Sequence, residues 1–116
     1  MSERTNFLME YQNITMIKGD TLSFNCFVYN DEHLPFMVDD SHFSCKKKAT
    51  GSEYVFRKSL GSGISQDENG MMTVRVAPED TEEIDAGQYF YDFEIRVNDD
   101  VYTVMIGTLS IENDIS

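Results

Sequence analysis

The stretch Asp85-Ala86-Gly87-Gln88-Tyr89-Phe90-Tyr91-Asp92 decides how this chain folds. It follows an acidic segment, residues 78–84, and runs on into a long alternating apolar pattern. An acidic turn, a glycine and a tyrosine at the start of a long strand are typical of the corner where a β-sandwich passes between its two sheets. There the tyrosine hydroxyl bonds back to the turn, so we predict that Tyr89 is mostly buried and that its hydroxyl bonds to backbone near Asp85 or Ile84. The alternative is an ordinary connection from a helical turn to a strand.

The residues around this tyrosine favour an immunoglobulin-like sandwich. Gly87 suits tight backbone at the corner, where a Cβ is costly. Antibody domains carry a cysteine two residues after the corner tyrosine, and it pairs with a cysteine of strand B. This chain has Tyr91 at the first position and Cys26 in the segment that corresponds to strand B. We therefore expect Cys26, Asp85, Gly87, Tyr89 and Tyr91 to be structural residues of the fold.

Short alternating segments separated by turn signals recur along the whole chain. The clearest is residues 21–28, where Leu22, Phe24, Cys26 and Val28 fall on one face. Further strands are predicted over residues 11–17, 41–48, 53–60, 64–66, 72–76, 89–97 and 101–111, with a helical turn over 78–84. Seven to eight strands predict an all-β, immunoglobulin-like antiparallel β-sandwich. We expect residues 1–10 to be an N-terminal arm or edge strand, and residues 11–116 to form a single domain.

The inward faces of these strands predict the core. We expect it to contain Leu22, Phe24, Cys26, Phe43, Val74, Tyr91, Phe93 and Ile95. The last strand, residues 101–111, is apolar on both faces, which favours a strand that is covered on both sides or that docks on a partner. An antibody-type domain would also place a tryptophan on the segment 41–48, but the chain contains no tryptophan.

The charge balance argues against polyanionic partners. Nine basic and 21 acidic side chains give a net charge of −12. That field repels nucleic acid and anionic membrane surfaces. No apolar run is long enough for a transmembrane helix, and residues 1–6 lack the apolar region of a signal peptide. These features favour an intracellular folding compartment, with a processed secreted protein as the alternative.

The cysteine and histidine residues give no sign of a reactive site. Cys26 and Cys45 fall on strands that an immunoglobulin order places in opposite sheets. We expect two reduced, buried thiols, and a bridge between them is the alternative. His33 and His42 lack the cysteine and histidine spacing of a zinc site.

The carboxylate pairs and the known catalytic motifs give no sign of a reactive site either. Asp39-Asp40 and Asp99-Asp100 offer carboxylates for calcium, but they lack the alternating spacing of a calcium loop, and solvated turns are expected. Asn13-Ile14-Thr15 is a glycosylation sequon that matters only in a secreted protein. The chain has no nucleophile elbow, phosphate loop or zinc-protease motif. We therefore expect no enzyme activity, no cofactor and no metal.

Four segments in order carry a family resemblance: Ile17-Lys18-Gly19-Asp20-Thr21-Leu22, Ala77-Pro78-Glu79-Asp80-Thr81, the corner stretch, and Gly107-Thr108-Leu109-Ser110-Ile111. The ordered set resembles small immunoglobulin-like β-sandwich proteins of bacteriophage and prophage tail modules, and the N-terminal domain of siphophage baseplate upper proteins. The resemblance implies a non-enzymatic structural or adaptor protein of the tail or baseplate. It implies other tail or baseplate proteins as partners, with self-association, in the virion or the bacterial host cytoplasm.

Two other classes of function compete with this one. The first is an extracellular immunoglobulin-like or carbohydrate-binding module. A carbohydrate-binding face would need a platform of exposed aromatic side chains, for which the candidates are Phe27, Tyr29, Tyr54 and Tyr102. The second is an enzyme on a sandwich scaffold, which the sequence favours least.

Overall fold

The computed structural model describes residues 10–27 and 37–114. In chain order these form β1 (Glu10–Tyr11), β2 (Ile14–Ile17), β3 (Leu22–Phe27), β4 (Asp40–Lys46), β5 (Phe56–Leu60), β6 (Gly63–Gln66), β7 (Met71–Val76), α1 (Pro78–Thr81), β8 (Gly87–Val97) and β9 (Asp100–Glu112). The predicted arm, apart from Glu10, lies outside the described residues, as do Val28, Tyr29 and His33.

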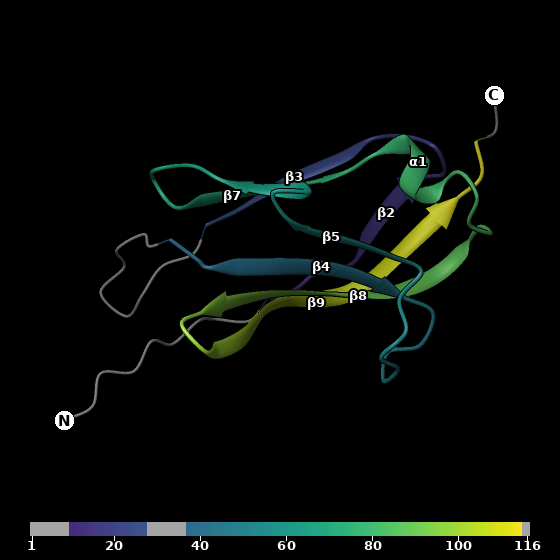
Figure 1. The fold of residues 1–116 in the computed structure, drawn as a ribbon. Helices are drawn as coiled ribbons and strands as arrows, with labels where there is room; N and C mark the ends of the chain where they lie inside the picture. The colour runs from purple at the N-terminus through teal and green to yellow at the C-terminus, as the bar shows by residue number, and fades with distance from the viewer. Residues whose placement is uncertain (1–9, 28–36, 115–116) are drawn as a thin grey trace.

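The strands form a curled sheet that folds into two layers. Their order is β1-β9-β8-β4-β5-β6-β7-β3, and β2 also pairs with β9. In Figure 1, β4, β8 and β9 form the lower layer and β3 and β7 the upper one, with β5 running between them. β3 and β7 correspond to strands B and E, while β4, β8 and β9 correspond to C, F and G. The chain is therefore an all-β, immunoglobulin-like sandwich, as the sequence predicts.

Not every pairing is antiparallel. β1 and β2 both run parallel to β9, and β5 runs parallel to β6. The described residues hold nine strands rather than the expected seven to eight, because the strand predicted over residues 11–17 is interrupted. The strand predicted over 53–60 begins only at Phe56, which leaves Tyr54 and Val55 exposed in the connection before it.

β9 contains a bulge that bears on its apolar pattern. Phe93 pairs with Met105 and Glu94 pairs with Thr103, so Val104 is an extra residue between two register pairs. Such a bulge shifts the alternation of a strand by one residue. Val104 and Met105 are both buried as a result. The change of phase therefore accounts for the burial of both Val104 and Met105, whereas Val101 stays 51% exposed. Covering of the second face by a partner stays a prediction.

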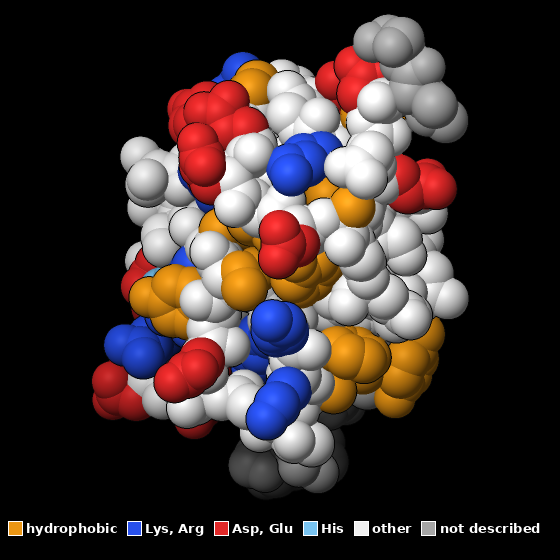
Figure 2. Space-filling view, turned by 90° about the vertical axis from the view of Figure 1, so that its right-hand side faces the viewer, with side chains coloured by type: hydrophobic (Ala, Val, Ile, Leu, Met, Phe, Trp, Pro, Cys, Tyr) orange, Lys and Arg blue, Asp and Glu red, His pale blue; other side chains and the backbone are white. Residues whose placement is uncertain are grey.

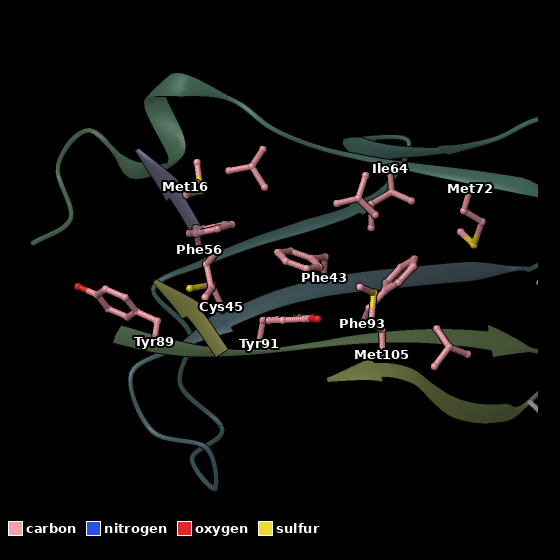
Figure 3. Packing of buried hydrophobic residues seen from close by; sticks show 14 of the residues in the cluster. Met16, Phe43, Cys45, Phe56, Ile64, Met72, Tyr89, Tyr91, Phe93 and Met105 are labelled. Carbon is pink, nitrogen blue, oxygen red and sulfur yellow. The ribbon is translucent and has the colours of Figure 1, made fainter. Parts of the chain in front are cut away.

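The core lies between the two layers and centres on Phe43 (Figure 3). Its ring stacks on Tyr91 with centroids 5.1 Å apart and meets Phe24 edge-on at 5.6 Å. Antibody domains place a tryptophan on strand C against the B–F disulfide. Here Phe43 on β4 and Tyr91 on β8 fill that space with two stacked rings.

Five of the eight predicted core residues are buried: Phe43, Val74, Tyr91, Phe93 and Ile95. The other three, Leu22, Phe24 and Cys26, face the core but are only half-buried. All three lie on β3, which pairs with β7 on one side and ends the sheet order on the other. An edge strand is covered less completely than a central one, so these three predicted core residues pack against the core without being fully buried.

The helical turn before the corner is shorter than predicted and joins distant segments. α1 ends at Thr81 rather than continuing to residue 84. The carboxylate of Asp80 accepts a hydrogen bond from the backbone N–H of Ala77 at 2.7 Å, which caps the turn. The same carboxylate forms an ion pair with Lys58 at 3.0 Å. Thr81 is fully buried, and its hydroxyl accepts from the N–H of Gly19 at 2.9 Å.

Candidate functional site

The predicted corner hydrogen bond is present. The hydroxyl of Tyr89 donates to the carbonyl oxygen of Asp85 at 2.6 Å, and the side chain is 5% exposed. Burial raises the pKa of Tyr89, and the nearby charge of Asp85 adds to that effect. Gly87 opens β8 with a φ of 158°, and a Cβ there would meet nothing within 4 Å. The cost of a Cβ at this position therefore comes from the backbone conformation, which residues with a side chain rarely adopt, and not from crowding.

Tyr91 fills the position of the antibody cysteine and makes a long-range contact. Its hydroxyl donates to the carbonyl oxygen of Gln12 at 2.7 Å, across 79 residues of sequence. Burial raises the pKa of Tyr91 to about 12, and negative charge at Glu10 and Cys26 acts in the same direction. Tyr91 therefore ties the start of the chain to the centre of the sandwich.

A glycine makes room for this contact. Gly107 pairs with Tyr91 across β8 and β9, and a Cβ at Gly107 would collide with the carbonyl group of Gln12 and crowd the ring of Tyr91. The side-chain oxygen of Asn13 accepts from the N–H of Thr108 at 3.2 Å. Gln12, Asn13, Tyr91 and Gly107 form what we call the latch.

The latch explains why the first strand is interrupted. β1 aligns Glu10 with Met105, and β2 aligns Ile14 with Leu109, so the parallel register is the same on both sides of the break. At the break the N–H of Gln12 still donates to the carbonyl of Ile106 on β9 at 3.0 Å. The Gln12 carbonyl instead accepts from Tyr91, and the side chain of Asn13 accepts from the N–H of Thr108. The interruption is thus a local detour around Gly107, not the end of one strand and the start of another.

Residues 10–17, which we call the edge segment, are weakly buried. Met16 is buried and Ile14 is half-buried, whereas the remaining side chains are exposed. Tyr11 is 75% exposed and Ile17 is 39% exposed. Among the described strands the edge segment pairs only with β9, so no described strand pairs with its outer side, where Tyr11 and Ile17 are exposed. This edge is the candidate interaction site.

The other candidates from the sequence are accounted for locally. Cys26 and Cys45 are free thiols on β3 and β4, in opposite layers. Burial raises their pKa values to about 11 and about 12. Cys45 is buried as expected, but Cys26 is half-buried because β3 is an edge strand.

The histidine and carboxylate candidates serve the surface of the sheet. His42 lies 3.7 Å from Asp40 and 3.7 Å from Glu94 on the outer face. The carboxylate of Asp39 accepts from the N–H of Asn98 and fixes the β8–β9 turn, where Asn98 has a φ of 57°. Within residues 10–27 and 37–114, no group of three or more His, Cys, Asp or Glu side chains could hold a metal ion.

The aromatic candidates lie on three separate elements. Phe27 ends β3, Tyr54 precedes β5 and Tyr102 lies on β9. The guanidinium of Arg57 covers one face of the Tyr54 ring at 4.4 Å. Figure 2 shows the end of the sandwich that carries α1, where acidic and basic side chains are interspersed around hydrophobic ones. Both acidic and basic side chains therefore lie on this face, although the chain as a whole has a net charge of −12.

The latch went unrecognised in the sequence. A glycine inside an alternating strand is a signal for close approach of another backbone, and Gly107 fits that description. Nothing local shows that the approaching backbone is Gln12, because the two residues are far apart in sequence and meet only through the parallel pairing with β9.

Among the solved structures that are similar to this chain is an immunoglobulin-like module of a receptor. The N-terminal Ig1-2 module of the Drosophila receptor protein tyrosine phosphatase DLAR is 18% identical, with a TM-score of 0.45. The match covers 90% of this chain and 47% of that one, so the chain spans about half the length of the neighbour. No protein-family model matches the chain, and no curated protein matches it. No helix in the described parts of the chain is long and apolar enough to span a membrane.

Proposed function

We propose that this protein is a non-enzymatic structural or adaptor component of a phage or prophage tail or baseplate, which acts through protein–protein contacts. The observation that carries the proposal is the edge segment. Tyr11 and Ile17 are exposed on a strand whose outer backbone groups pair with no other described strand. Native proteins usually block such edges, and an open apolar edge favours the addition of a partner strand.

The sequence supplies the identity of the proposed partners. The four ordered segments resemble proteins of phage tail modules, and two of them touch this region. Residues 17–22 begin at the last residue of the edge segment, and residues 107–111 begin at Gly107 of the latch. The net charge of −12 disfavours nucleic acid as the partner. We therefore expect other tail or baseplate proteins on this edge, in the virion or in the host cytoplasm during assembly.

Site-specific photocrosslinking tests this proposal. A benzophenone amino acid at Tyr11 samples the edge, and the same group at Tyr54 is a matched control, because that side chain is 49% exposed in the β4–β5 connection. In cells that produce the phage or induced prophage, we expect a tail or baseplate protein to crosslink at position 11 and not at position 54. Equal crosslinking at both positions, or products that contain only host proteins, would contradict the proposal.

A further inference from the structure

We propose that β9 is a strand-acceptor edge, and that the edge segment of one copy of this chain docks on β9 of a second copy. In the single chain the same edge is filled by the chain's own residues 10–17. The inference rests on the proposed role in protein–protein contacts and names the partner as a second copy. The purified protein alone tests it, so its failure leaves open an interaction with a different tail protein.

The acceptor side is firmly held. β9 pairs with β8 from Asp100 to Ile111, and its inward side chains Met105, Leu109 and Ile111 are buried in the core. Tyr91 is fixed by stacking on Phe43. If the edge segment left, β9 would keep its position and present a row of unpaired backbone groups, with the Tyr91 hydroxyl beside them. Such an edge binds an extended strand.

The donor side is weakly held. Met16 is the one buried side chain of the edge segment, and the pairing with β9 is parallel, which is slightly less stable for each residue than antiparallel pairing. Segments with few buried contacts open locally at a low free-energy cost. A weakly held donor beside a rigid acceptor is the arrangement that strand exchange requires.

The turn after the edge segment can serve as the hinge. Residues 18–20 follow Ile17, and Gly19 has a φ of 83° with open space at its Cβ position. The hydroxyl of Thr81 accepts from the N–H of Gly19, which anchors the far end of the turn to α1. Every contact of the edge segment can re-form on a second copy, so the exchanged dimer and the monomer contain equivalent contacts. The conformation of the hinge then determines the equilibrium between the two.

The latch selects a second copy as the occupant. A strand that docks beside Gly107 must turn one carbonyl group toward Tyr91 and place an acceptor side chain next to the N–H of Thr108. Gln12 and Asn13 meet both requirements in the register that aligns Ile14 with Leu109. The chain's own sequence is therefore the ligand that the edge is shaped to recognise.

Disulfide trapping between two full-length variants tests the exchange. Thr15 and Ser110 are register partners, so a Thr15→Cys chain mixed with a Ser110→Cys chain can form the matched bond only between copies. The native thiols stay protonated near neutral pH, because burial raises their pKa values to about 11 and about 12. We expect a covalent heterodimer whose yield rises with protein concentration from micromolar to millimolar. Tyr91→Phe should speed its formation about fivefold to tenfold, by loss of one buried hydrogen bond.

The matched control replaces the acceptor position with one on the opposite edge strand. Ser23 is exposed on β3, so Thr15→Cys mixed with Ser23→Cys reports random collision. A second matched pair, Ile17→Cys with Glu112→Cys, joins two exposed register partners and covers the case in which the first pair misfolds. Heterodimer yields no higher than the Ser23→Cys control with both pairs, at every concentration, would overturn the proposal.

Discussion

Tyr89 and Tyr91 lie two residues apart on β8 and make the same kind of hydrogen bond. One bond joins residues close in sequence, and the other joins residues far apart. Each hydroxyl donates to a backbone carbonyl, at 2.6 Å for Tyr89 and 2.7 Å for Tyr91. Tyr89 reaches back four residues and closes a corner, whereas Tyr91 reaches across 79 residues and holds the N-terminal strand. The first bond shapes one local connection, and the second sets how firmly an exchangeable segment is attached.

The largest expected effect is on the free energy of unfolding, and it comes from removing a core side chain of β8, the strand that carries both tyrosines. Phe93 lies between the two layers on the same strand and is fully buried. Phe93→Ala should lower the free energy of unfolding by about 3–5 kcal/mol, through lost burial and the cavity left behind. That is a large part of the roughly 6–17 kcal/mol available to a domain of this size.

Phe24→Ala is the control for that measurement. Phe24 faces the same core from the half-buried edge strand β3, so its replacement should cost clearly less than that of Phe93 in urea unfolding. Equal costs for the two variants would mean that β3 is as well covered as β8.

The next largest effect is expected from a substitution that disturbs the surroundings of Tyr91 but not those of Tyr89. A Cβ at Gly107 would collide with the Gln12 carbonyl and crowd Tyr91, while the corner at Tyr89 is not involved. Gly107→Ala should cost about 1–3 kcal/mol, as overpacking does, and should speed hydrogen exchange in residues 14–18 but not near the corner. Gly51→Ala is the control, because a Cβ there makes only ordinary contacts, at 3.8 Å or more. Unchanged exchange in residues 14–18 would show that the detour does not depend on Gly107.

Removing each hydroxyl sharpens the comparison. Tyr89→Phe and Tyr91→Phe should each cost about 1 kcal/mol, since each leaves a carbonyl group without its donor. The costs should be similar, but the consequences should differ. Tyr91→Phe should raise hydrogen exchange at the edge segment, and Tyr89→Phe should raise it around residues 82–86. If both variants loosen the same segment, the two bonds belong to one cooperative unit.

The contrast also marks how far sequence reasoning reaches. The corner hydrogen bond was predicted to backbone near Asp85 or Ile84, and the structure has it to Asp85. Its signal is local: an acidic turn, a glycine and a tyrosine that follow one another in sequence. The strands were predicted for the same reason, since alternation is a property of neighbours. The roles of Gln12 and Gly107 could not be found in this way, because they depend on which distant strands become adjacent.

Two other misses have the same origin. The phase change at Val104 depends on register against β8, so the alternation of residues 101–111 alone did not reveal that Val104 and Met105 are both buried. The half-burial of Cys26 depends on the position of β3 at the end of the sheet order. The local sequence pattern predicts where the strands are. Which face of each strand is buried depends on the strands that pack beside it.

The smallest effect is a difference in alkaline stability between the two tyrosine variants. The pKa of Tyr91 rises from an ordinary 10.0 to about 12, and that of Tyr89 also rises. The unfolded chain therefore loses these protons first as the pH increases, and the free energy of unfolding falls between about pH 10 and about pH 12. The thiols of Cys26 and Cys45 act in the same direction from about pH 9 in every variant.

Comparing Tyr89→Phe with Tyr91→Phe isolates the contribution of each tyrosine to the loss of stability at alkaline pH. Below about pH 9 both hydroxyls are protonated in either state, so the two variants should differ little there. Above pH 10, Tyr91→Phe should lose stability less steeply than Tyr89→Phe, because it removes the group with the more strongly raised pKa. Urea unfolding at a series of alkaline pH values measures this slope. A steeper loss in Tyr91→Phe would mean that the Tyr91 hydroxyl is open to water, and hence that the edge segment is already detached from β9.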